Sequence, residues 1–193
     1  MECLEEASSA MRSIAKSGRK ILFVATKKQA RDIVQEAAKS VNMPYVTDRW
    51  LGGMMTNFAT IRKSIKKMQN IETMLSDTSL TSITKKEKLT LEREKIKLDR
   101  VLGGIANLNR IPAAMFVVDI THEHLAVTEA QKLGIRTIAM VDTNSNPNLV
   151  DFPIPANDDA SKSVTVITNL MVDAIKEGLE DRKKAKAELE TTK

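Results

Sequence analysis

Two lysine side chains near the start of the chain have a spacing that suits phosphate binding. Lys27 and Lys28 directly follow the apolar run 21–25 and lie at the start of a predicted helix over 28–41. Ammonium groups and a helix N-terminus both favour an anion at such a junction. The competing interpretation is two ordinary surface lysines, and the sequence leaves both open.

The stretch RWLGGMMTN, which begins at Arg49, adds further groups that suit an anionic partner. The Arg49 guanidinium can hold a phosphate through two hydrogen bonds. Gly52 and Gly53 permit close backbone approach or a positive φ angle. Thr56 and Asn57 offer polar hydrogen bonds, and either could instead cap the following helix. We therefore expect this stretch to belong to a binding surface.

Trp50, the only tryptophan of the chain, has two interpretations. An indole ring can stack on an unpaired base of RNA. It can equally fix the loop by filling a place in the core. We favour the core interpretation.

Four basic residues follow on a helix predicted over 58–75. Arg62 with Lys66, and Lys63 with Lys67, are like-charged pairs four residues apart, which mildly destabilise an isolated helix. A polyanionic partner would relieve this repulsion. A solvated helix face is the competing interpretation.

A nucleotide-dependent enzyme is the alternative from a different class of function. It would need a glycine-rich turn after the first strand, and the turn at 26–29 is TKKQ. No GxGxxG and no GxxxxGK[ST] occurs in the chain. We therefore expect no nucleotide cofactor, and calorimetry with ATP, NAD and FMN would separate the two classes.

Residues that could serve catalysis or metal binding are sparse. His122, Glu123 and His124 lie together, but side chains two apart at a helix start do not converge on one ion. There is no GxSxG elbow, and Cys3 is a terminal cysteine with no evident base. We expect no catalytic residue, no cofactor and no metal, and hence not an enzyme.

Charge is distributed unevenly along the 193 residues. The segment 16–67 carries twelve Lys and Arg against three Asp and Glu, whereas 112–173 carries three against eight. Such asymmetry indicates one half that faces a polyanion and another that faces something else.

A single cysteine excludes a disulfide framework, and no apolar run approaches the ~20 residues of a membrane span. We expect a cytoplasmic protein with no membrane partner.

Alternation of short apolar runs and amphipathic stretches predicts an α/β fold with a mostly parallel sheet sandwiched by helices, Rossmann- or flavodoxin-like. Expected strands are 21–25, 43–46, 114–120, 137–142 and the extended piece 152–155, and expected helices are 2–17, 28–41, 123–133 and 160–180. The segment 76–84 is a polar turn between predicted helices 58–75 and 85–102. These two helices predict an antiparallel hairpin, a coiled-coil arm inserted into the sheet.

The expected domains follow from this interruption. Residues 1–57 and 104–180 form a discontinuous α/β domain, and 58–103 form the helical hairpin arm. Residues 181–193 are a charged flexible tail.

Several long stretches resemble one known family. They are ILFVATKKQARDIV, MPYVTDRWLGGMMTNFATIRKSIKKM, TKKEKLTLEREKIKLDRVLGGI, PAAMFVVDITHEHLAVTEAQKLGI and IAMVDTNSNPNLVDFPIPANDDASKSV. The chain from Lys20 to about Leu179 resembles the bacterial small-subunit ribosomal protein S2 family. Arg136 departs from it, because the family commonly has an apolar residue or proline there. The resemblance also implies a further segment before the position that matches Met1.

The resemblance implies a structural component of the small ribosomal subunit in translation. Its implied partners are small-subunit ribosomal RNA and neighbouring ribosomal proteins, including ribosomal protein S1, with no DNA and no membrane. Candidate RNA-binding residues are Lys27, Lys28, Arg49, Gly52, Gly53, Thr56, Asn57, Arg62, Lys63 and Lys66. A protein-binding adaptor is the third hypothesis. Replacing Lys27, Lys28, Arg49 and Arg62 by Glu would leave the function of such an adaptor intact.

Overall fold

A computed structural model describes residues 2–76 and 84–191, which form six α-helices around a five-stranded sheet. The elements in chain order are α1 (Glu2–Lys16), β1 (Ile21–Val24), α2 (Arg31–Ser40), β2 (Tyr45–Val46), α3 (Phe58–Ser76), α4 (Lys85–Leu102), η1 (Gly103–Ile105), β3 (Ala114–Val118), α5 (His124–Leu133), β4 (Arg136–Val141), η2 (Pro147–Leu149), β5 (Phe152–Pro155) and α6 (Ser161–Thr191). No helix among these described residues is long and apolar enough to cross a membrane.

All five strands are parallel, in the order β2-β1-β3-β4-β5. This is the doubly wound, flavodoxin-like order, in which the chain reverses its direction of growth between β1 and β3. The parallel α/β fold predicted from the sequence is confirmed. Strands buried on both faces read as continuous apolar runs, and this is why β1 and β3 were recognisable.

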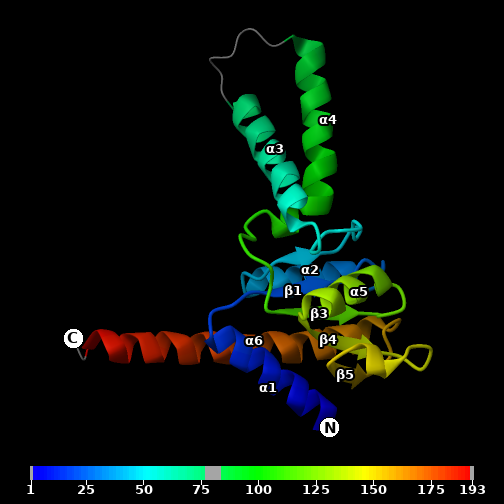
Figure 1. Cartoon of the computed structure of the whole chain (residues 1–193), viewed down its shortest axis with the longest axis vertical. Helices are drawn as coiled ribbons and strands as arrows, with labels where there is room; N and C mark the ends of the chain where they lie inside the picture. The colour runs from blue at the N-terminus through cyan, green and yellow to red at the C-terminus, as the bar shows by residue number, and fades with distance from the viewer. Residues whose placement is uncertain (1, 77–83, 192–193) are drawn as a thin grey trace.

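Each face of the sheet has its own apolar core. Phe23 and Phe116 face the layer made by α1, α2 and α6, and their rings pack edge to face at 5.4 Å between centroids. Leu22 and Met115 face the opposite layer, made by α5, the loop before α3 and the bases of α3 and α4. Figure 1 shows these layers on either side of the strands.

α3 and α4 lie side by side and project away from the sheet (Figure 1). Ion pairs of Lys67 with Glu94 and of Lys95 with Glu72 join them. The buried side chains of α3 are Ile61, Ile65, Met68 and Ile71, whereas α4 buries only Leu102 at its base. A capping box between Thr84 and Glu87 starts α4. The predicted turn at 76–84 falls mostly on 77–83, outside the described residues.

Two predicted helix boundaries are wrong by three residues or more, and β2 and β3 are each two residues shorter than predicted. α2 begins at Arg31 rather than 28, because Lys27 to Ala30 form a turn closed by bonds from Ala30 N and Arg31 N to the Lys27 carbonyl. Lys28 therefore lies in that turn, before the helix. The last helix was expected to end at 180, yet α6 continues to Thr191. Arg12 of α1 donates two hydrogen bonds to Asp181 and holds this extension against α1. The predicted flexibility of 181–193 stays a prediction.

Substituting Gly178 tests the close packing of α1 on α6. A Cβ at Gly178 would lie 2.4 Å from the Arg12 carbonyl oxygen and 2.9 Å from the Ala15 Cβ, so Gly178→Ala must push the helices apart. We expect a loss of about 1–3 kcal/mol in the free energy of unfolding, measured by urea titration. Gly52→Ala is the matched control, since nothing lies within 4 Å of its added Cβ. Equal stability of the two variants would contradict this packing.

Candidate nucleic-acid interface

A single buried carboxylate shapes the loop between β2 and α3. Glu129 of α5 is 7% exposed and accepts hydrogen bonds from Trp50 Nε1 at 3.1 Å and Gly53 N at 2.7 Å. It also accepts from Met55 N at 2.8 Å and from Thr56 N and Oγ1 at 2.9 and 3.1 Å. One side chain of α5 thus fixes the loop that precedes α3.

The same hydrogen bonds explain the ionisation of Glu129. Burial alone would raise the pKa of its carboxyl, but the bonds from Thr56 N, Trp50, Met55 N and Gly53 N outweigh burial and hold that pKa below its usual value. Glu129 is thus a stable anion near neutral pH.

Trp50 is 6% exposed within the core, which confirms its predicted anchoring role and leaves its ring buried away from bases.

The loop leaves some of its candidate residues exposed. Arg49 is exposed and has no hydrogen-bond or ion-pair partner in the described part of the chain. Gly53 adopts φ +84°, a conformation that glycine permits, whereas Gly52 has no positive φ. The Thr56 hydroxyl bonds to Glu129, so it does not cap α3. The backbone carbonyl of Asn57 accepts hydrogen bonds from the amides of Thr60 and Ile61 in the first turn of α3.

The first turns of α3 continue this surface. Lys63 and Lys66 are exposed, and neither has an ion-pair partner within residues 2–76 or 84–191. Arg62 is half-buried, and its Nη1 donates to the Asn109 carbonyl at 3.1 Å and to Asn109 Oδ1 at 2.9 Å. The other guanidinium nitrogens of Arg62 make no hydrogen bond in the described chain, so they can still donate to a partner in solvent. We call Arg49, Lys63 and Lys66 the free basic set.

Lys28 lines a groove between α2 and the base of α4. β1 and β2 are parallel neighbours, so the loops after them reach the same sheet edge, and Thr47 and Asp48 also line this groove. Its basic side chains are Lys28, Arg31, Lys39 and Arg100. The last three of these were not predicted from the sequence.

A signal for two of the missed residues was present. Arg31 and Lys39 stand on one face of α2 at eight residues' separation, with Gln35 between them, a polar stripe at four-residue steps. Arg100 had no such signal, because it reaches the groove from α4 and bonds to Asp48 at 2.8 Å. Asp32, Asp48 and Asp99 share the groove, so its excess positive charge is small.

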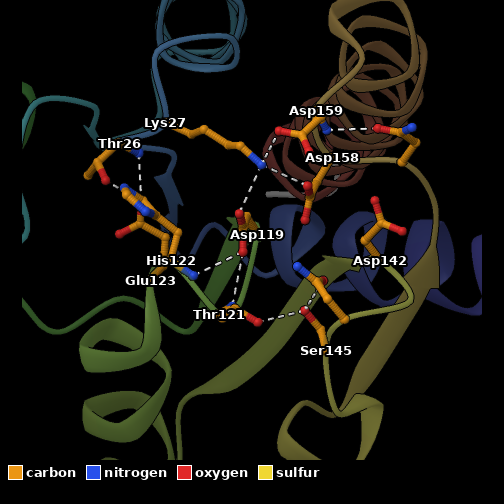
Figure 2. A network of polar contacts seen from close by, with 12 residues as sticks. Thr26, Lys27, Asp119, Thr121, His122, Glu123, Asp142, Ser145, Asp158 and Asp159 are labelled. Atoms are coloured by element: carbon orange, nitrogen blue, oxygen red, sulfur yellow. Dashed lines mark hydrogen bonds and ion pairs between the residues drawn. The ribbon is translucent and has the colours of Figure 1, made fainter.

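Lys27 points into a network of carboxylates at the carboxyl edge of the sheet (Figure 2). Its Nζ lies 3.0 Å from Asp119, 2.9 Å from Asp158 and 2.5 Å from Asp159. Burial would lower the pKa of Lys27, but these three carboxylates hold it above its usual value. Asp119 adopts φ +67° and also accepts bonds from the Thr121 and His122 amides.

This network makes a phosphate contact by Lys27 unfavourable, and that contact stays a prediction. The Lys27 ammonium is already held by three carboxylates, whose negative charge would repel a phosphate. The network also occupies the edge where a doubly wound sheet binds a nucleotide. Glu123 closes the same edge by accepting bonds from Thr26 N and Oγ1. Residues here therefore serve the fold of the protein itself.

Comparisons with known proteins agree with this geometry. The sequence model of the family described as Ribosomal protein S2 matches residues 1–178. A relative from Cytophaga hutchinsonii named small ribosomal subunit protein uS2 is 58% identical over 184 residues, which are 95% of this chain and 72% of that protein. Proteins of the same name from Flavobacterium johnsoniae and Flavobacterium psychrophilum are 59% and 57% identical, over 93% and 98% of this chain and 70% and 71% of theirs.

The family match and these relatives define the class: a structural protein of the small ribosomal subunit rather than an enzyme. Within that class, the chain belongs to the ribosomal protein S2 family. The predicted family and role in translation are confirmed. Arg136, the predicted departure, is exposed at the first position of β4, where a charged side chain meets solvent.

Proposed function

We propose that this chain binds small-subunit ribosomal RNA through the loop that Glu129 holds and the first turns of α3. The observation that carries this proposal is the free basic set: Arg49, Lys63 and Lys66 are exposed and unpaired in the described chain, next to a loop fixed by five hydrogen bonds. Unpaired basic side chains beside a rigid loop suit contacts with RNA phosphates. Such contacts position a protein on RNA without recognising particular bases.

The remaining candidates take supporting roles in this proposal. Gly52 and Gly53 let RNA approach the backbone, and Thr56, Asn57 and Arg62 border the same surface. The groove lined by Lys28, Arg31, Lys39 and Arg100 would bind a second stretch of the RNA sugar–phosphate backbone beside the arm. Residues 58–103 would act as a coiled-coil arm that reaches beyond the α/β body formed by 1–57 and 104–180.

Neutralising the free basic set tests the RNA interface. Arg49→Gln, Lys63→Gln and Lys66→Gln together should weaken binding to small-subunit ribosomal RNA uniformly across its sequences. The slope of log K against log salt should fall by about 2–3, at roughly 0.7–0.9 for each phosphate that the variant no longer neutralises. Filter binding at several salt concentrations measures both.

The control keeps the same change in net charge. Lys162→Gln, Lys183→Gln and Lys184→Gln alter exposed lysines of α6, on the other face of the sheet. The proposal requires this variant to bind like the unmodified protein. If both triple variants lose the same affinity and slope, net charge rather than a local interface governs binding.

Neighbouring ribosomal proteins are the second class of partner. α5 and η2 expose Leu125, Leu133 and Leu149 within the acidic segment 112–173, and this surface suits a protein more than RNA. We propose that ribosomal protein S1 is among these neighbours and that the protein works in the bacterial cytoplasm, on the ribosome. Crosslinking of assembled subunits should join Lys132 to a neighbouring protein, and crosslinks from Lys132 to RNA alone would contradict this assignment.

A further inference from the structure

One buried oxygen in the Lys27 network has no partner. Asp158 is 1% exposed, and its Oδ1 lies 2.9 Å from the Lys27 ammonium. Its Oδ2 is buried and accepts no hydrogen bond among the described residues. In Figure 2 this oxygen points away from Lys27, on the side of Asp142 and Ser145. A buried carboxylate oxygen without a partner is unfavourable, so it indicates a missing positively charged or donating group.

Negative charge around Asp158 exceeds the positive charge that the chain supplies. Asp119 and Asp142 directly follow β3 and β4, and Asp159 lies next to Asp158 before α6. Lys27 is the one lysine that forms ion pairs with Asp119, Asp158 and Asp159 in the described chain. Burial raises the pKa of Asp158, Lys27 opposes that rise, and Asp119 and Asp142 add to it. The cluster therefore carries four carboxylates against one ammonium.

The oxygens beside Asp158 Oδ2 are of the kind that hard cations bind. The Asp142 carboxylate accepts the Thr143 amide and hydroxyl through Oδ1 and a hydrogen bond from the Asp158 backbone, so it lies directly beside Asp158. Thr121 Oγ1 and Ser145 Oγ lie 2.8 Å apart at the same edge. No three His, Cys, Asp or Glu side chains in the described residues converge on one metal position. A site here can therefore supply only two carboxylates.

We infer that Asp158 and Asp142 hold one hydrated divalent cation, Mg²⁺ by its chemistry, at the carboxyl edge of the sheet. Mg²⁺ suits one or two carboxylates because it keeps several of its waters, and those waters can bond to the nearby hydroxyls. Such an ion would link the end of β4 to the turn before α6. It would complete the edge that Lys27 already closes and is independent of RNA binding.

Thermal unfolding of the full chain without RNA tests this site. After EDTA treatment, added MgCl₂ should raise the Tm by a saturable amount, about 3–5 °C at ten times the Kd. KCl of equal ionic strength should not reproduce the rise. The rise should vanish in Asp158→Asn and in Asp142→Asn, where the second variant covers the case that the first does not fold. Asp173→Asn, which alters an exposed aspartate of α6, is the control and should keep the full rise.

Binding of Mn²⁺, followed by electron paramagnetic resonance, gives the second readout. The unmodified chain and Asp173→Asn should bind one Mn²⁺ that both site variants lose. The inference is overturned if all four proteins respond to Mg²⁺ alike. It is also overturned if no divalent ion raises the Tm while acidification does, since a proton on Asp158 would then satisfy the buried oxygen.

Discussion

Glu129→Gln will loosen the loop before α3 and lower the free energy of unfolding by about 2–5 kcal/mol. Both carboxylate oxygens are used: Oε1 accepts from Trp50 and Gly53, and Oε2 accepts from Met55 and Thr56. An amide keeps only one acceptor oxygen, so at least two buried donors lose their partner. Urea titration measures the stability.

Trp50 reports the loop directly, because it is the only tryptophan of the chain. Its emission should shift to longer wavelength in Glu129→Gln as water reaches the indole. Glu36→Gln, an exposed position on α2, makes the same chemical change and should alter neither observable. An unshifted spectrum with unchanged stability would mean that the loop holds its shape without Glu129.

The pKa of Glu129 gives the same interaction a pH dependence. Its pKa is lower in the folded than in the unfolded chain, because the donated bonds outweigh burial. A lowered carboxyl pKa contributes stability that is complete above the unfolded value and is lost as pH falls through the folded value. Stability of the unmodified protein should therefore decline on acidification, and Glu129→Gln should show a shallower decline.

Lys27→Met will destabilise the protein by about 3–5 kcal/mol, the usual cost of removing one partner from a buried ion pair. The change leaves Asp119 and Asp158, which are 6% and 1% exposed, without their cation. Lys28→Met is a control one residue away, since Lys28 is exposed and has no ion-pair partner in the described chain. Urea titration should separate the two clearly.

A double variant sharpens this prediction. Adding Asp158→Asn to Lys27→Met removes the most buried uncompensated charge, so part of the lost stability should return. Equal stability of Lys27→Met and Lys28→Met would show that the carboxylates do not depend on Lys27. Additive losses in the double variant would show that Lys27 and Asp158 act separately.

Local patterns predicted most of the fold. β1, β3 and β4 are apolar runs because a parallel sheet buries them on both faces, and the helices between them show a matching periodicity. The end of α6 could not be predicted in this way. Its last turns are charged along the sequence, and contact with Arg12, some 170 positions earlier, holds Asp181 in place.

The candidate site was less predictable, because long-range contacts decide which charges are free. Lys27 and Lys28 are adjacent and alike in sequence, yet one is held by three carboxylates from distant loops and the other faces solvent. Glu129 was missed for the same reason, since it is one acidic residue of a helix and its partners lie more than seventy positions earlier. Sequence spacing alone contains no sign of either arrangement.

Sedimentation of a tagged copy in bacterial lysate is the sharpest test of the proposed place on the ribosome. The protein should migrate with the small ribosomal subunit on a sucrose gradient at low salt and leave it at high salt, because phosphate contacts dominate its affinity. The variant lacking the free basic set should leave at lower salt than the α6 control. Migration of the folded, unmodified protein as a free small protein at low salt would contradict a ribosomal role.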